Sequence, residues 1–317
     1  MPLAVLFWGS LLTSLFVIFS FILLIWKFTP TTDWSYIFHL DYRYIALAFL
    51  LIALYHTFDM LRLKTIAEGY NIKYSYGYAY ATSLVATFGA TITPAHIGGE
   101  LIIFYMLKRL GVRTSKIWGT ILFKTVSGMS FFILALPVFI YYLYSHPKVI
   151  GKLMLLAVIF LTFSLISYPL VKMFRKLEHN RKQRKLIRTL KLYCLAILYF
   201  WKYHKWLFIK ACIYSILLYL TFLSFAPVLL KAFHVNLPIV KIYMMELPLV
   251  YAIFTSPSPG GSGVGELGAA AIFQDLIAPS VIGLFVILWR FFSQYFSAIL
   301  GGLIFSLYVL RDWKKEG

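Results

Sequence analysis

The chain consists of long apolar runs separated by short polar segments. A helix needs about 20 predominantly apolar residues to cross a hydrocarbon core of roughly 30 Å. Six runs meet this requirement and are flanked by charged or aromatic residues. We therefore predict membrane-spanning helices at residues 4–26, 43–60, 117–144, 150–173, 206–231 and 281–310. This pattern indicates an all-α polytopic membrane protein.

Two further apolar regions, residues 76–110 and 238–278, are interrupted near their middle by proline and glycine. Each predicts a helical hairpin, with second arms at about residues 97–110 and 266–278. At about 1.5 Å per residue such an arm reaches roughly 20 Å, so it would stop near the midplane of the bilayer. We expect the two tips to enter from opposite faces and to meet around one cavity, which Lys124 and Arg290 would line.

These elements divide the single membrane domain, residues 1–317, into two halves of matching order. Residues 1–145 and 150–310 each contain a span, a second span, a hairpin and a third span, and the two hairpins are opposed. Both tips run from a hydroxyl residue and proline, through glycines, to a glutamate. Interrupted helices at corresponding places in two inverted halves indicate a transport site near the midplane.

Composition excludes a soluble globular protein. Hydrophobic residues make up 61% of the 317 positions and charged residues 13%, so the polar surface is too small to cover a globule of this size. The longest polar stretch, near residues 172–205, is too short to form a soluble catalytic domain. Any chemistry should therefore take place in or at the bilayer.

The formal net charge of +19 follows membrane topology rather than a nucleic-acid surface. The bases are not interleaved with the exposed aromatic residues and glycines of an RNA-binding face, so we expect no nucleic-acid partner. Placing both termini in the cytoplasm puts 21 Lys and Arg in cytoplasmic segments and six outside, as the positive-inside rule favours. We expect a multi-pass protein of the cell membrane with residues 172–205 on the cytoplasmic side.

Eleven of the 30 Lys and Arg fall between residues 172 and 205. Within that segment Arg175 to Lys191 is amphipathic, so it can lie at the membrane interface and hold anionic headgroups. The candidate headgroup surface consists of Arg181, Lys182, Arg184 and Lys185. The alternative is that these bases only determine the topology.

The two predicted tips supply the first candidate substrate-binding residues. Irregular backbone is tolerated at membrane depth only where it is buried in protein or lines a wet cavity. Glycines there would free amide N–H groups at the start of each second arm, where the helix dipole favours an anion. The candidates are Thr93, Pro94, His96, Gly98, Gly99, Pro259, Gly260, Gly261 and Gly263. The alternative is that the glycines only allow close helix packing.

Acids and bases within the apolar sequence supply the remaining candidates. Glu100 and Glu266 lie just inside the second arms, where an uncompensated carboxylate would be costly. Lys124 and Arg290 occupy matching spans, so we expect one glutamate–base pair in each half, either as a static ion pair or as part of headgroup binding or proton coupling. Glu246, in the first arm of the second hairpin, could join them. We expect His56 and Asp59 to be interfacial.

The sequence does not predict a cofactor. His96 and Glu100 share a helix face, but two ligands do not make a metal site. Cys194 and Cys212 have no CxxC or Cys/His ligand spacing, and no phosphate-binding loop for ATP is present. We therefore expect no metal, no cofactor and no catalytic residue set.

At its two tips the sequence resembles the transmembrane domain of the lysylphosphatidylglycerol synthase/flippase family. Thr93 to Glu100 is similar to the first family motif, and Pro257 to Glu266 is similar to the second, with one residue fewer before the acid. Arg290 fits the Tyr-Arg stretch of the last span. The family usually has an arginine and a downstream aspartate in the span after the first hairpin, where this chain has Lys124 and then Ser127 and Gly128.

The resemblance covers nearly the whole chain and implies the lipid-translocating membrane domain without the aminoacyl transferase domain. The expected function is a lipid flippase or related transporter for a polar, anionic or lipid-linked headgroup. One alternative is an intramembrane lipid-modifying enzyme with Glu100 or Glu266 as acid or base. Another is a non-transporting scaffold for a glycosyl- or aminoacyl-transferase partner.

Overall fold

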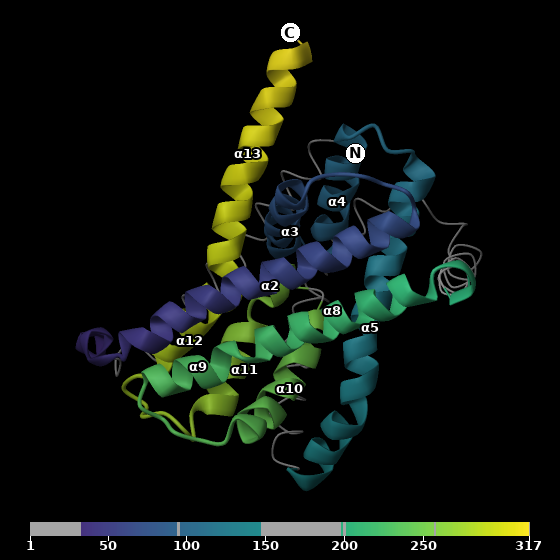
Figure 1. Ribbon diagram of the computed structural model, residues 1–317. Helices are drawn as coiled ribbons and strands as arrows, with labels where there is room; N and C mark the ends of the chain where they lie inside the picture. Colours follow the sequence, from purple (N-terminus) through teal and green to yellow (C-terminus); the bar gives the residue numbers. More distant parts are fainter. Residues whose placement is uncertain (1–32, 94–95, 147–197, 199–200, 257, 317) are drawn as a thin grey trace, which may run out of the picture.

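The structure is a computed structural model that describes residues 33–93, 96–146, 198, 201–256 and 258–316. All regular structure in these residues is helical, which agrees with the predicted fold class (Figure 1). The predicted spans 4–26 and 150–173 and the candidate headgroup surface at residues 181–185 lie outside the described residues. The inverted repeat as a whole therefore stays a prediction.

Within the described residues, four helical stretches are long and apolar enough to cross a membrane: Tyr42–Gly69, Thr114–Ser145, Lys205–Ala232 and Ile282–Trp313. They coincide with the predicted spans 43–60, 117–144, 206–231 and 281–310. The first two are the helices α2 and α5. The third comprises α8 (Lys205–Leu223) and α9 (Phe225–Ala232). The fourth comprises α12 (Ile282–Arg290), a π-helical turn η5 (Phe291–Tyr295) and α13 (Phe296–Glu316) as far as Trp313.

Both proline- and glycine-broken regions form pairs of helices. The first pair is α3 (Tyr76–Thr91) and α4 (Ile97–Arg109), and the second is α10 (Ile239–Thr255) and α11 (Val264–Phe273). A short 3₁₀ turn η4 (Pro259–Gly261) lies between α10 and α11, and another, η2 (Trp34–His39), precedes α2. In Figure 1, α2 and α8 run side by side across the molecule, with α3 and α4 on one side and α10 and α11 on the other.

Local sequence explains where several helices begin. Asp41 Oδ1 accepts a hydrogen bond of 3.0 Å from the backbone N–H of Arg43 at the start of α2. Ser75 Oγ accepts one of 3.2 Å from the N–H of Tyr78 at the start of α3. Such side chains satisfy amides that the helix itself leaves unpaired.

In the described part of the chain, the buried apolar side chains form two main clusters, one for each helix pair. One cluster is built mainly from α9 to α12 and includes Trp289 and Phe285. The other joins α3 and α4 to the ends of α2 and α5, and α13 packs against it. The two helix pairs are thereby fixed on either side of α2 and α8, where a cavity lies between them.

Candidate functional site

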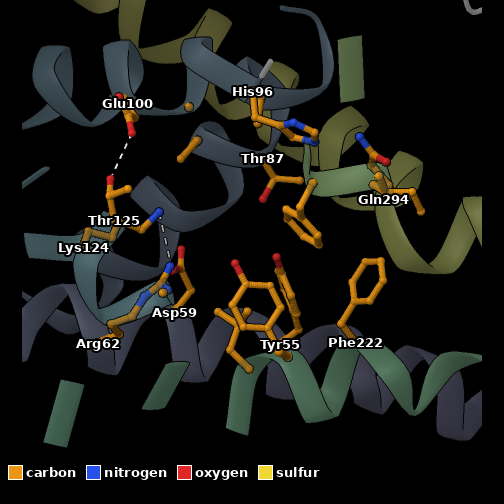
Figure 2. Close-up of a pocket in the computed structure, with 18 of the residues that line it drawn as sticks. Tyr55, Asp59, Arg62, Thr87, His96, Glu100, Lys124, Thr125, Phe222 and Gln294 are labelled. Carbon is orange, nitrogen blue, oxygen red and sulfur yellow. Dashed lines mark hydrogen bonds and ion pairs between the residues drawn. The ribbon is translucent and has the colours of Figure 1, made fainter. Parts of the chain in front are cut away.

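A cavity of about 500 Å³ lies between the two helix pairs (Figure 2). Its walls come from α2, α3, α4, α5, α8, α10 and the π-helical turn η5. Its volume falls within the range of about 300–1,000 Å³ that is usual for ligand pockets. The cavity is lined by the predicted site residues Lys124, Glu100, Gly99 and His96, together with residues outside the predicted site.

Three charged side chains form an ion cluster at one end of the cavity (Figure 2). Arg62 Nη2 lies 2.5 Å from Asp59 Oδ1, and Lys124 Nζ lies 3.6 Å from the same oxygen. The side chains of Asp59 and Arg62 are 8% and 7% exposed, whereas that of Lys124 is 20% exposed. Lys124 is thus the more open and more loosely held of the two cations.

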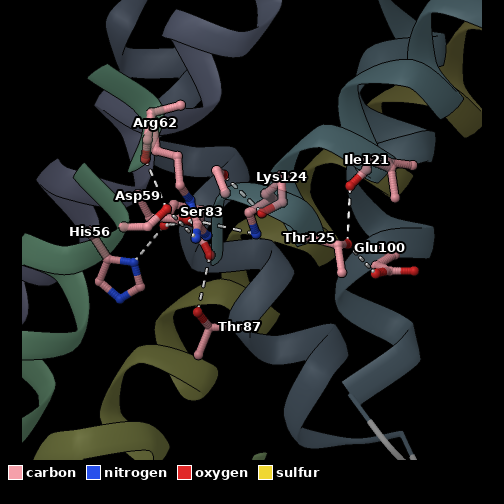
Figure 3. Close-up of polar contacts among 12 residues, drawn as sticks. His56, Asp59, Arg62, Ser83, Thr87, Glu100, Ile121, Lys124 and Thr125 are labelled. Atoms are coloured by element: carbon pink, nitrogen blue, oxygen red, sulfur yellow. Dashed lines mark hydrogen bonds and ion pairs between the residues drawn. The ribbon is translucent and has the colours of Figure 1, made fainter. Parts of the chain in front are cut away.

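This arrangement corrects the expected partner of Lys124. We expected an ion pair with Glu100, but Lys124 pairs with Asp59, and Glu100 Oε1 accepts a hydrogen bond of 3.1 Å from Thr125 Oγ1 (Figure 3). The reason is that α2 crosses beside α5 and presents Asp59 to Lys124. Asp59 is therefore buried in the protein rather than interfacial.

His56 is also fully buried, contrary to the expected interfacial position. Its Nδ1 lies 2.9 Å from Ser83 Oγ, and its Nε2 lies 2.8 Å from Ser297 Oγ. Ser83 Oγ in turn donates a hydrogen bond of 2.7 Å to Asp59 Oδ2. The ion cluster is thereby connected through α3 to α13.

The first tip is held by Thr93 rather than by charge. Thr93 Oγ1 accepts a hydrogen bond of 2.7 Å from the backbone N–H of Gly98 and donates one of 2.7 Å to the Gly89 carbonyl oxygen. His96 has a left-handed backbone with φ of 58°, and its ring stacks on Phe254 at 5.6 Å between centroids. Pro94 lies outside the described residues.

The second tip is organised around a buried ion pair. Arg290 Nε lies 2.8 Å from Glu266 Oε1, and both side chains have no exposed surface. Glu266 also accepts hydrogen bonds from Tyr295 Oη and from the backbone N–H of Gly263, while Arg290 Nη2 donates to the Gly260 carbonyl oxygen at 3.0 Å. The predicted Glu266–Arg290 pair is therefore present.

Neither member of this pair lines the cavity, which corrects the expected position of Arg290. The α10–α11 hairpin packs against the guanidinium group, because a Cβ on Gly265 in α11 would lie only 2.8 Å from Arg290 Cζ. Glu246 is also absent from the cavity wall. It is fully buried and accepts a hydrogen bond of 3.1 Å from Trp289 Nε1.

The two tips lie against each other. Gln294 Nε2, on η5, donates a hydrogen bond of 3.1 Å to Thr91 Oγ1 at the end of α3. A Cβ on Gly260 would lie 3.2 Å from Thr91 Cα, so the backbone of the second tip touches the first hairpin directly. Gly260 has a φ of 57°, a conformation that glycine adopts without strain. Pro259 and Gly261 complete this turn.

Aromatic side chains form a second part of the cavity lining, the aromatic wall, in which Tyr55 and Phe222 are labelled in Figure 2. Its members come from α2, α5, α8 and α10, and they are Tyr55, Phe132, Tyr219, Phe222, Tyr251 and Phe254. The ion cluster can thus hold a charged group of a ligand, while the aromatic wall can contact an apolar part of the same ligand. No group of three or more His, Cys, Asp or Glu suited to a metal ion occurs in the described part of the chain.

Sequence reasoning missed Asp59, Arg62, Thr125 and Gln294 as cavity residues. A signal for two of them was present, because Asp59 and Arg62 are three residues apart and so share a helix face next to an apolar run. Charged residues so placed usually pair with one another or face a wet cavity. Gln294 carries no such signal, since its position depends on the π-helical turn.

Two comparisons with known proteins agree with the resemblance at the tips. The sequence profile described as the lysylphosphatidylglycerol synthase TM region matches residues 7–301. A UPF0104 membrane protein of Archaeoglobus fulgidus is 21% identical over 311 residues, which cover 91% of this chain and 94% of that protein. The match to the profile extends over both helix pairs and the cavity between them. The chain therefore belongs to the lysylphosphatidylglycerol synthase transmembrane-region family.

Proposed function

We propose that the protein moves a polar lipid between the two leaflets of the cell membrane, with the headgroup passing through the cavity between the helix pairs. The observation that carries this proposal is the cavity's division into an ion cluster and an aromatic wall. A phosphate-bearing headgroup can contact Lys124, while the adjoining acyl region contacts Phe222 and Phe254. The family's membrane lipid-related role supports the same substrate class.

In this proposal α3–α4 and α10–α11 are re-entrant hairpins that enter from opposite faces. Their contact at Thr91, Gly260 and Gln294 would then separate the two sides of the membrane. A headgroup would cross by a change in how the tips pack, without covalent chemistry. The proposal places both termini in the cytoplasm and includes a transferase as the partner that supplies the lipid.

Vesicles that contain the purified protein and a trace of fluorescently labelled phosphatidylglycerol test this function. A membrane-impermeant quencher reports how much label reaches the outer leaflet. The wild-type protein should expose label from the inner leaflet, and Lys124→Gln should slow that exposure by about tenfold or more, since one charged contact is worth about 1.5–3 kcal/mol.

Lys108→Gln is the matched control, because Lys108 is an exposed lysine near the end of α4 and lies outside the cavity wall. It should retain the wild-type rate. Equal rates for Lys124→Gln and the wild type would contradict headgroup binding at the ion cluster. Label exposure no faster than in protein-free vesicles would contradict transport and would favour the scaffold or enzyme alternative.

A further inference from the structure

The ionised form of the Asp59 carboxyl group depends in part on its contact with Lys124. Asp59 Oδ1 contacts Arg62 at 2.5 Å and Lys124 at 3.6 Å, and its other oxygen accepts from Ser83. An anionic headgroup in the cavity would compete for the more open cation, Lys124. Because a buried carboxylate depends on its partners, losing one favours the neutral form of Asp59.

Beyond Asp59 lies an unbroken chain of hydrogen bonds, part of which is shown in Figure 3. It runs from Asp59 Oδ2 to Ser83 Oγ, then to His56 Nδ1, and from His56 Nε2 to Ser297 Oγ, with distances of 2.7, 2.9 and 2.8 Å. His56, Ser83, Asp59 and Ser297 are all buried. The chain thus connects the cavity to α13 through groups that can each donate or accept a proton.

The directions of these hydrogen bonds follow from the charge on Asp59. An ionised carboxylate only accepts, so Ser83 donates its single hydroxyl proton to Asp59. His56 Nδ1 must then carry the proton that it donates to Ser83 Oγ. In a neutral imidazole Nε2 is left as an acceptor, so Ser297 donates to it.

We propose that Asp59 takes up one proton when an anionic headgroup binds Lys124, and that the Ser83–His56–Ser297 chain reverses its direction to stabilise the protonated carboxyl. This inference rests on the proposed function, because it assumes that a headgroup occupies the cavity. The proton enters at the Ser297 end of the chain, and each group passes one proton on: Ser297 to His56 Nε2, His56 Nδ1 to Ser83, and Ser83 to Asp59.

All groups remain hydrogen-bonded in the reversed chain. Protonated Asp59 donates to Ser83 Oγ, Ser83 donates to His56 Nδ1, and His56 Nε2–H donates to Ser297 Oγ. The chain then holds one proton more than before, and His56 is neutral in both states. Ser297 keeps a hydroxyl proton and donates it in a hydrogen bond to a carbonyl oxygen of its own helix, as helical serines can.

Groups from several helices act on Asp59 and His56. They are Tyr55 and Arg62 on α2, Tyr74 before α3, Tyr80 on α3, Lys124 on α5 and Tyr219 on α8. Among them Arg62 and Lys124 carry positive charge, and Arg62 is the more deeply buried. Displacement of Lys124 toward a ligand is therefore the change to which Asp59 responds.

Isothermal titration calorimetry in detergent tests the coupling, with dihexanoylphosphatidylglycerol as the probe. Titrations in PIPES and in Tris, which differ in ionisation enthalpy, give the number of protons taken up on binding. The wild-type protein should take up about one proton per headgroup, and its affinity should rise about tenfold for each unit that the pH falls. Asp59→Asn should bind the probe without proton uptake and with an affinity that does not change with pH.

Two hydroxyl variants on α3 test the chain. Ser83→Ala removes the link between His56 and Asp59, so proton uptake should fall well below that of the wild type. Thr82→Val is the matched control, because Thr82 is also buried but donates to the Tyr78 carbonyl of its own helix. It should keep full uptake. Gel filtration and circular dichroism of each variant identify any loss of folding.

The outcomes separate this inference from the proposed function. Probe binding without proton uptake in the wild type, or full uptake in Asp59→Asn, overturns the coupling and leaves lipid transport standing. Absence of probe binding overturns the inference, and the vesicle assay decides transport independently. The same titrations are repeated with inorganic phosphate in place of the lipid probe. If phosphate binds as tightly as the probe and with the same proton uptake, the coupling stands but the ligand of the site is free phosphate.

Discussion

At the scale of single residues, the Glu266–Arg290 ion pair stabilises the second tip. Both side chains are fully buried, and Arg290 also donates to the Gly260 carbonyl oxygen. Removing one partner of such a pair leaves an uncompensated buried charge, which costs about 3–5 kcal/mol. We therefore expect Arg290→Met to lower the free energy of unfolding by that amount, measured by denaturant unfolding in detergent.

Arg43→Met is the control for this substitution, because Arg43 is exposed at the start of α2. It should change the stability by less than about 1 kcal/mol. If Arg290→Met instead unfolds like the wild-type protein but loses lipid transport, then Arg290 binds the headgroup directly and its structural role is wrong.

The two ion pairs show what the sequence can predict about partners. The sequence predicts the Glu266–Arg290 pair correctly, because Glu266 begins the second arm of the last hairpin and Arg290 lies in the span that follows it. Lys124 was paired wrongly with Glu100, since the rotation of α5 and its crossing with α2 bring Asp59 closer. Sequence spacing specifies the face of a helix on which a charge lies, but not which neighbouring helix that face meets.

At the scale of elements, α3 and α4 approach so closely that a side chain on Gly98 has no room. A Cβ there would collide with the Gly89 carbonyl oxygen and with Thr93. Overpacking of this kind costs about 1–3 kcal/mol. Gly98→Ala should therefore lower the thermal unfolding temperature and increase proteolysis at the first tip.

Gly77→Ala provides the comparison, because a Cβ at Gly77 meets nothing within 4 Å. That substitution should leave the stability unchanged or raise it by up to about 1 kcal/mol, since alanine favours a helix over glycine. Equal unfolding temperatures for the two variants would show that the helix pair can separate without cost.

The elements themselves were largely predictable where composition changes sharply. Proline and glycine marked both tips, and four apolar runs marked helices long enough to span. The π-helical turn at Phe291–Tyr295 was not predictable, because its residues are as apolar and aromatic as those of the helix around it. Yet this turn places Gln294 against Thr91, so a feature without a sequence signal connects η5 to the end of α3.

At the scale of the whole molecule, the proposed topology places the segment between residues 172 and 205 in the cytoplasm. We expect a cysteine introduced as Gln183→Cys, with Cys194 and Cys212 replaced by serine, to resist a membrane-impermeant thiol reagent in intact cells. It should react after the cells are permeabilised. Rapid labelling from outside would reverse the topology and remove the basis for opposed hairpins.

The charges that line the cavity also determine how the membrane potential acts on transport. Asp59, Arg62, Lys124 and Glu100 are fixed to the protein and sum to zero. If a headgroup with one negative charge crosses together with one proton, no net charge moves through the field. A potential of 100 mV, which would change the energy of one unpaired charge by about 2.3 kcal/mol, should then leave transport of such a lipid unaffected. In Asp59→Asn vesicles the headgroup would cross with its charge uncompensated, and the rate should become voltage-dependent.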